Sequence, residues 1–160
     1  GNWLVNVDLP AEGERYHLLL VGSSMPTIVP DNVTVIDAFR PAPQVARLMA
    51  SADALLHAGD QETFGLVILE AMASGIPVVA VAAGAFTEIV HEDCGLLCTP
   101  NNPLAMANAV RQLFSEGCQR RGLLARRHVE RHYAWDSVVN SLLGHYYAVL
   151  GEQMPLQANG

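Results

Sequence analysis

The chain has 160 residues, of which 51% are hydrophobic, and its mean hydropathy is +0.22. A chain of this size and composition can bury a large apolar core, so we expect one globular domain rather than a disordered segment. Its 16 acidic residues outnumber its 9 basic residues, which gives a net charge of −7 and a pI of about 5.2. Such a field repels phosphate backbones and anionic lipids, so nucleic acid is not an expected partner.

All nine basic residues are arginines, and the chain contains no lysine. Schiff-base chemistry and lysine phosphate clamps are therefore excluded for this chain. Its three cysteines (Cys94, Cys98 and Cys118) form no CxxC pair and lack a histidine at metal-ligand spacing. We therefore expect free thiols, a reducing cytoplasmic setting and no metal site. No apolar stretch reaches the ~18 residues of a membrane span, and we expect none.

From Tyr16 onward, short apolar runs alternate with helical patterns. This alternation is typical of parallel strands joined by crossover helices, and it predicts an α/β fold with a doubly wound, three-layer α/β/α sheet of the Rossmann type. In chain order we expect strands at 17–21 and 33–36, a helix at 44–51, a strand at 54–57, a helix at 64–73 and a strand at 77–81. Then follow a short helix at 86–90, a strand at 95–98, helices at 103–115, 119–131 and 135–150, and a frayed tail at 156–160.

Several residues mark the expected helix ends. Gly75 ends a helix, while Asn102 and Pro103 supply the cap and the first helical position of another. Trp135 is expected to anchor the last helix to the core.

The N-terminal segment departs from the alternating pattern. Residues 3–7 (WLVNV) resemble another buried strand, but only about ten residues separate them from the next strand, too few for a crossover helix. This spacing predicts a sheet edge from which a crossover helix is missing. An unpaired apolar edge strand favours association of two copies, so we expect a homodimer as one outcome.

The most informative segment runs from Glu62 to Val79 (ETFGLVILEAMASGIPVV). A helix is expected to begin there after a parallel strand, at the sheet edge where open α/β folds bind ligands. Its free amides at Phe64, Gly65 and Leu66, together with the helix dipole, are suited to an anion such as a phosphate.

Two glutamates accompany this helix start. Glu62 lies just before it, either as an acid that favours the dipole or as a ligand-binding group at the mouth of a cleft. Glu70 lies about two turns in, and its neighbours three and four residues away include no cation. Its carboxylate is therefore either on a solvated stripe or aimed at hydroxyl or amide donors.

Two other features also leave alternatives open. His57 ends an apolar strand and is either a structural residue with a hydrogen-bonded imidazole or part of a pocket wall. Five arginines make the helix at 119–131 basic, and this surface is either solvated or a docking face for another domain or an anionic surface.

The motifs ETFG at 62–65, EAMASGIPVVA at 70–80, Gly84 and EIV at 88–90 occur in this order. Together they resemble the donor-site signature of the retaining GT-B glycosyltransferases of group 1, which include sucrose synthases and many bacterial mannosyl- and glucosyltransferases. A looser similarity extends over most of the chain and corresponds to the C-terminal half of such an enzyme.

The resemblance implies three parts: a truncated N-terminal segment at 1–14, a nucleotide-sugar-binding domain at 15–150 and a tail at 151–160. It also implies site residues: Glu62 as the catalytic residue that contacts the donor sugar, Thr63, Phe64, Gly65, Leu66 and Gly22 for sugar and phosphate, Glu70 for the ribose, and Ala38 and Phe39 for the base. The donor is a substrate, and no cofactor or metal is implied.

The sequence departs from the family pattern at its phosphate contacts. The family holds the diphosphate with an arginine and a lysine, and this chain has no lysine. Gly59 replaces the usual serine before the first glutamate, and Ala85 replaces the second glycine of a usual pair.

The implied function is transfer of a hexose from a nucleotide diphosphate sugar to an acceptor with retention. In this family the acceptor is bound mainly by an N-terminal domain, which is missing from this chain. The chain alone is therefore expected to be inactive. Paired glutamates also occur in glycoside hydrolases, but the surrounding motifs argue against hydrolysis. Two alternatives remain: a non-catalytic nucleotide-sugar-binding or assembly module, and a GT-B nucleotide-sugar epimerase.

Overall fold

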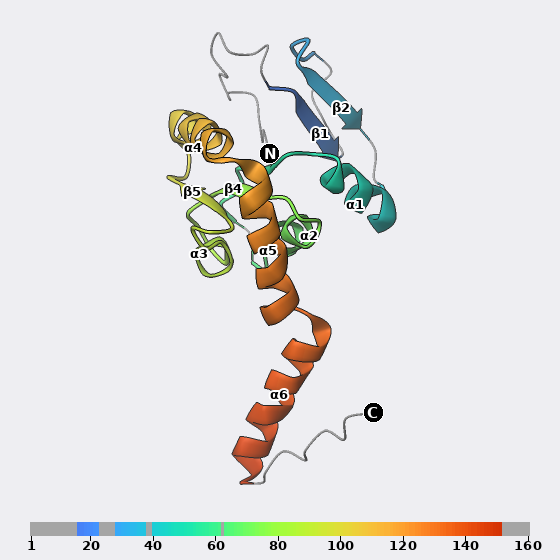
Figure 1. Ribbon diagram of the computed structural model, residues 1–160, viewed down its shortest axis with the longest axis vertical. Coiled ribbons are helices and arrows are strands. Elements are labelled where there is room, and N and C mark those ends of the chain that lie inside the picture. The colour runs from blue at the N-terminus through green and yellow to red at the C-terminus, as the bar shows by residue number, and fades with distance from the viewer. Residues whose placement is uncertain (1–15, 23–27, 38–39, 62, 152–160) are drawn as a thin grey trace.

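The computed structural model describes residues 16–22, 28–37, 40–61 and 63–151 (Figure 1). In chain order its elements are β1 (Leu18–Gly22), β2 (Val33–Asp37), α1 (Ala42–Ala50), β3 (Leu55–His57), α2 (Leu66–Ala73), β4 (Val78–Val81), α3 (Phe86–Ile89), β5 (Gly95–Cys98), α4 (Pro103–Glu116), α5 (Cys118–His132) and α6 (Trp135–Leu150). The strand expected at 3–7 and the tail expected at 156–160 lie outside the described residues.

Every described strand pair is parallel, and helices connect most of the strands. The fold is therefore of the expected Rossmann-like α/β class. The described strands nevertheless pair in two groups, β1-β2 and β3-β4-β5, rather than in the single sheet that the sequence predicts. A ladder forms only where backbones approach to about 4.8 Å, and among the described strands β1 and β3 do not meet in this way.

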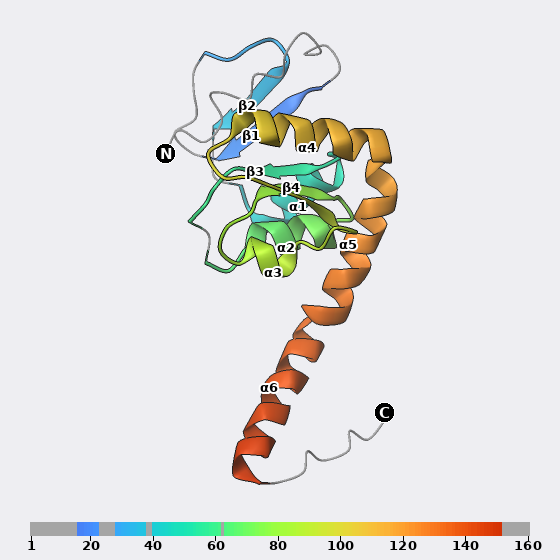
Figure 2. The same ribbon diagram turned by 90° about the vertical axis from the view of Figure 1, so that its left-hand side faces the viewer.

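The core lies around β4, the middle strand of its group. All four β4 residues are buried, and α4 covers one face of the group while α2 and α3 lie on the other (Figure 2). A strand covered on both faces needs a continuous apolar run instead of an alternating one, which explains the sequence VVAV. Phe86, Ile68 and Leu113 are fully buried around it.

Most element boundaries agree with the sequence predictions to within two residues. The Asn102 cap is confirmed, because the Ala105 N–H donates to Asn102 Oδ1 at 3.0 Å. Cys94, directly before β5, and Cys98, the last residue of β5, are buried, as expected for packing residues.

Arg121 fastens the start of α5 to the rest of the fold. Its guanidinium donates to the backbone carbonyls of Glu92 and Gly95 and pairs with the Glu116 carboxylate. Hydrogen bonds from Gln112 and Arg121 hold the pKa of Glu116 below its usual value. The arginine thus links α4, α5 and the loop before β5.

Helix α6 extends away from this body (Figures 1 and 2). None of its residues is buried, and the prediction that Trp135 anchors the helix to the core is wrong, since the side chain is 82% exposed.

The close approach of α5 to the turn after α2 depends on Gly122. A Cβ at Gly122 would lie 2.0 Å from the carbonyl oxygen of Gly75, which is backbone and cannot simply rotate away. We predict that Gly122→Ala lowers the free energy of unfolding by about 2 kcal/mol or more, measured by urea denaturation.

Gly144→Ala is the matched control. Gly144 lies in α6, and a Cβ there would meet nothing within 4 Å. This variant should gain up to about 1 kcal/mol from helix propensity. Equal effects of the two substitutions would contradict the steric argument.

Candidate functional site

The candidate site lies at the carboxyl edge of the β3-β4-β5 group. Because these strands are parallel, the loops at 58–65, 82–85 and 99–102 all leave the same edge. The first of these loops leads into α2, the second into α3 and the third into α4. Open α/β sheets bind their ligands at this edge.

Helix α2 begins at this edge with Gly65 as its N-cap. Gly65 has φ 65° and ψ 26°, a left-handed conformation, and no side chain caps the helix. The helix therefore begins at Leu66, two residues later than predicted, so that of the amides expected to be free in the first turn only Leu66 belongs to the helix proper. A helix start of this kind, at the carboxyl edge of a parallel sheet, is suited to an anion.

Phe86 and Ile89 form the floor beneath Gly65. A Cβ at Gly65 would lie 2.7 Å from Ile89 Cδ1 and 3.5 Å from two ring atoms of Phe86. Gly65 is buried, yet the side chains of Phe64 and Leu66 on either side of it are 72% and 63% exposed. The backbone is thus seated on the core while the flanking side chains face solvent. Phe86 is not among the predicted site residues, and the available signal was its position after β4 in an apolar segment.

Glu70 lies on the exposed side of α2. No hydrogen bond or ion pair within the described part of the chain reaches its carboxylate. Its backbone carbonyl accepts a hydrogen bond from the Ser74 hydroxyl at 2.8 Å, which closes the helix end. The carboxylate is therefore accessible to a ligand, and Thr63 is exposed as well.

His57 ends β3 at the root of the 58–65 loop. Its Nδ1 accepts a hydrogen bond from the Gly59 N–H at 3.2 Å, and its ring packs edge-on against Phe86 with centroids 4.9 Å apart. The bonded imidazole that the sequence left as one alternative is therefore present.

A second contact, missed by the sequence analysis, reaches the loop from the start of α4. The amide of Asn101 donates to Asp60 Oδ2 at 3.4 Å. Asn101 has φ 56°, a left-handed conformation that asparagine tolerates better than most residues. The sequence signal was an asparagine directly before a capping residue.

The departure at Ala85 is tolerated by the backbone. Ala85 has φ −61° and ψ −19°, so its Cβ introduces no strain, whereas Gly84 has φ 52°. Only the first position of the usual glycine pair requires glycine here.

The remaining predicted site residues lie in the other strand group or outside the described residues. Gly22 ends β1 opposite Asp37 of β2, in the other strand group. Glu62, Ala38 and Phe39 lie outside the described residues.

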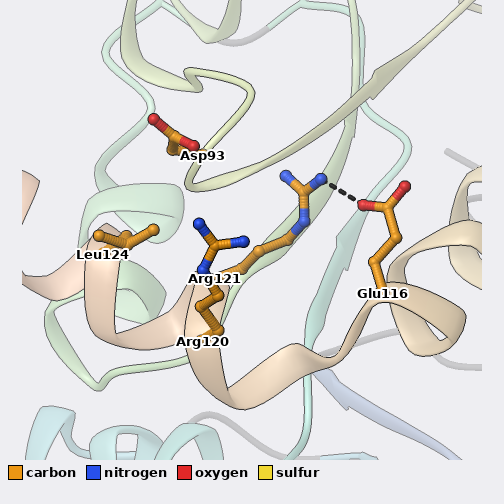
Figure 3. Close-up of a pocket in the computed structure, with 5 residues that line it drawn as sticks. All are labelled: Asp93, Glu116, Arg120, Arg121 and Leu124. Atoms are coloured by element: carbon orange, nitrogen blue, oxygen red, sulfur yellow. Dashed lines mark hydrogen bonds and ion pairs between the residues drawn. The ribbon is translucent and has the colours of Figure 1, made fainter.

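A hollow of about 270 Å³ lies at the opposite, amino edge of the sheet (Figure 3). Its lining consists of Asp93, Glu116, Arg120, Arg121 and Leu124. Its acidic and basic groups balance, and Arg121 is held by Glu116. The hollow is therefore distinct from the carboxyl-edge site.

The titratable groups with shifted pKa values lie mainly away from the site. Burial raises the pKa of the thiols of Cys94, Cys98 and Cys118. Burial, with His91 and His132 beside the ring, lowers the pKa of His128. Within the described ranges, no cluster of histidine, cysteine or carboxylate side chains could hold a metal ion, and no helix is long and apolar enough to cross a membrane.

The family model for glycosyl transferases group 1 matches residues 4–116. The chain belongs to this family. A curated relative, a GDP-mannose-dependent alpha-mannosyltransferase of Mycobacterium tuberculosis, is 38% identical over 82% of this chain and 33% of its own length. Among solved structures, sucrose-phosphate synthase from Thermosynechococcus elongatus matches with a TM-score of 0.72 and 27% identity, over 84% of this chain and 39% of that one.

HepE from Anabaena, solved in complex with UDP-glucose, matches this group 1 chain with a TM-score of 0.64 and 25% identity, over 83% of this chain and 41% of that one. The chain thus spans well under half the length of these relatives. The matched family segment contains α2 and all three loops of the carboxyl edge.

The close packing of Gly65 against Ile89 and Phe86 predicts that a larger residue at this position destabilises the fold. Gly65→Ala should lower the free energy of unfolding by about 2 kcal/mol, because the new Cβ adds crowding by Ile89 to the strain of a positive φ. Thermal and urea denaturation would measure this loss.

Gly75→Ala provides the control, since Gly75 has φ +82° but a Cβ there would meet nothing within 4 Å. It should lose only the backbone term of about 1 kcal/mol. Ile89→Val removes Cδ1, so the Gly65→Ala/Ile89→Val double variant should lose less than the sum of the two single variants. Strict additivity would refute the contact.

Proposed function

We propose that this chain is the donor-binding domain of a glycosyltransferase that moves a hexose from a nucleotide diphosphate sugar to an acceptor with retention. The observation that carries this proposal is the start of α2, which has no side-chain cap and begins at buried Gly65 on the carboxyl edge of a parallel sheet, within the segment matched by the family. Such a helix start is suited to a phosphate group.

In this proposal, the amides around Phe64, Gly65 and Leu66 bind the distal phosphate and sugar. As the bond to the sugar breaks, negative charge grows on the leaving diphosphate, and fixed amides stabilise that charge without reorganising. Glu62 would contact the sugar hydroxyls, and the exposed Glu70 carboxylate would accept hydrogen bonds from the ribose. Gly22 would border the diphosphate, and Ala38 and Phe39 the base.

GDP-mannose is the first donor to test. A relative with 38% identity is named as GDP-mannose-dependent, and so is another with 43% identity over 99 residues. The HepE complex with UDP-glucose makes UDP-glucose the second donor to test. The three free thiols suit a reducing compartment, so we propose the cytoplasm as the site of action.

The missing lysine supports a second candidate function. Without the lysine of the family's phosphate clamp, the site would depend more heavily on helix-start amides. A module that binds nucleotide sugars without transferring them is compatible with this weaker clamp.

A second domain is the proposed partner for the apolar face of α6. Val138, Val139, Leu142, Leu143 and Tyr146 are 41–59% exposed and recur at helical spacing. An apolar stripe of this kind is typical of a helix that packs against another surface. We propose that this surface belongs to the acceptor-binding domain, because the chain spans only a third of the mannosyltransferase it matches.

Nucleotide binding tests the donor site. Calorimetric titration of the chain with GDP, UDP and ADP should detect one preferred nucleotide. Glu70→Ala should weaken that nucleotide's affinity about tenfold, because the ribose loses a charged acceptor. The free energy of unfolding should change by less than about 0.5 kcal/mol, since the side chain is exposed.

Glu92→Ala is the matched control, an exposed glutamate in the loop at the amino edge of β5. It should leave the affinity unchanged. If Glu70→Ala bound the nucleotide as tightly as Glu92→Ala, the ribose role would be refuted.

Transfer should require the second domain. We expect the isolated chain to bind the donor but to transfer no sugar, while a longer polypeptide containing the acceptor domain transfers it. In that longer protein, Leu142→Asp should reduce transfer by about tenfold or more, because it places a charge in the proposed interface. Radiolabelled GDP-mannose with a lipid or sugar acceptor provides the assay.

Ser141→Asp adds the same charge beside the apolar face and should have little effect, since Ser141 is exposed on the polar side of α6. Transfer by the isolated chain would refute the need for a second domain. Donor binding by the longer protein without transfer to any acceptor would instead favour the non-catalytic module.

A further inference from the structure

We propose that His57 is a positioning residue of the proposed donor site, which holds residues 58–61 after β3 and thereby helps to place the helix-start amides that receive the donor's distal phosphate. This inference rests on the proposed function. It concerns the loop between His57 and Gly65, whose two ends the structure ties to one buried aromatic ring.

The first tie is the hydrogen bond at the root of the loop. The N–H of Gly59, a buried residue, donates to His57 Nδ1 at 3.2 Å. This bond bends the chain back over the end of β3 only two residues after the imidazole. Since Nδ1 accepts, the neutral ring carries its proton on Nε2.

The second tie is the Phe86 ring. The imidazole packs against it edge-on, with centroids 4.9 Å apart and planes inclined at 73°. The same ring lies beneath Gly65 at the other end of the loop, where a Cβ would come within 3.5 Å of it. Phe86 is fully buried and cannot follow a displaced loop. Both ends of the loop therefore lie against the same buried ring.

These two contacts use different parts of the imidazole. The ring edge contacts Phe86, and Nδ1 holds Gly59. Phenylalanine would retain a ring but lose the acceptor. Asparagine would lose the ring but retain an acceptor at about the reach of Nδ1, whereas alanine would lose both.

The consequence is specific to the phosphate that the loop positions. If the loop shifts, the helix-start amides lose their alignment with the distal phosphate, but the ribose contact proposed for Glu70 on α2 does not depend on the loop. The affinity gained by a diphosphate over a monophosphate therefore reports on the loop, while Glu70 affects both ligands alike.

The test compares wild type, His57→Phe and His57→Asn, each as the full 160-residue chain. Amide exchange followed by NMR measures the protection of Gly59 and of Phe64 to Leu66. Calorimetry with GDP and GMP, or with UDP and UMP if uridine is preferred, measures the diphosphate advantage. In His57→Phe we expect about tenfold faster exchange at Gly59 and a diphosphate advantage reduced about tenfold.

His57→Asn should retain most of the Gly59 protection and of the diphosphate advantage. Rescue by asparagine separates positioning from a structural role, in which loss of the ring would be the damaging change in both assays. If His57→Phe does not fold, loss of Gly59 protection in His57→Asn overturns the proposal by itself.

Wild-type exchange and a wild-type diphosphate advantage in His57→Phe would overturn the proposal. Equal effects of the two substitutions would also overturn it. A wild-type chain that binds GDP and GMP equally would refute the phosphate role of the helix start, and thus the proposed function, while the exchange data would still judge whether His57 holds the loop.

Discussion

The packing of Phe86 is the interaction on which both the core and the candidate site depend. This ring is fully buried beside the central strand group, yet it contacts the imidazole of His57 and underlies Gly65. It thus links the rigid β4 core to both ends of the loop that follows β3, which Asn101 also contacts through Asp60. Close-packed interiors yield little to small displacements, so a loop seated on such a ring inherits a fixed position. Preorganised amides can act on a leaving phosphate only if their positions are fixed in this way.

Much of the fold could be predicted because the determinants were local. The run VVAV predicts a strand covered on both faces, and β4 is buried along its whole length. The pair Asn102-Pro103 predicts a helix start, and the cap hydrogen bond is present. In both cases the strand or the helix cap is formed by residues that are adjacent in the sequence. A local sequence pattern is therefore enough to predict it.

The remaining features depend on contacts between distant segments. The start of α2 lies at Leu66 because Gly65 takes a left-handed conformation over Ile89, a residue 24 positions away in the chain. The exposure of Trp135 follows from the direction in which α6 leaves α5, which no property of the indole determines. The separation of β1-β2 from β3-β4-β5 likewise reflects which backbones meet in space. For the proposed donor site, the motif predicts the helix start, Gly65 and Glu70, whereas the contacts of His57 and Gly65 with Phe86 join segments that are distant in the sequence.

The charge distribution explains why the helix start would have to supply most of the attraction for an anion. The chain carries a net charge of −7 and has no lysine, so its overall field opposes a nucleotide diphosphate. Arginines of α5 are engaged elsewhere: Arg121 with Glu116 at the amino edge, and Arg126 with Glu130 along the helix. Against such a field, an anion site needs attraction that is short-ranged and directional. Backbone amides at the end of a helix dipole meet that requirement, because their partial charges act within the first turn and keep their orientation only while the turn is rigid. An acidic chain can thus bind an anion, provided that the backbone around Gly65 is held firmly.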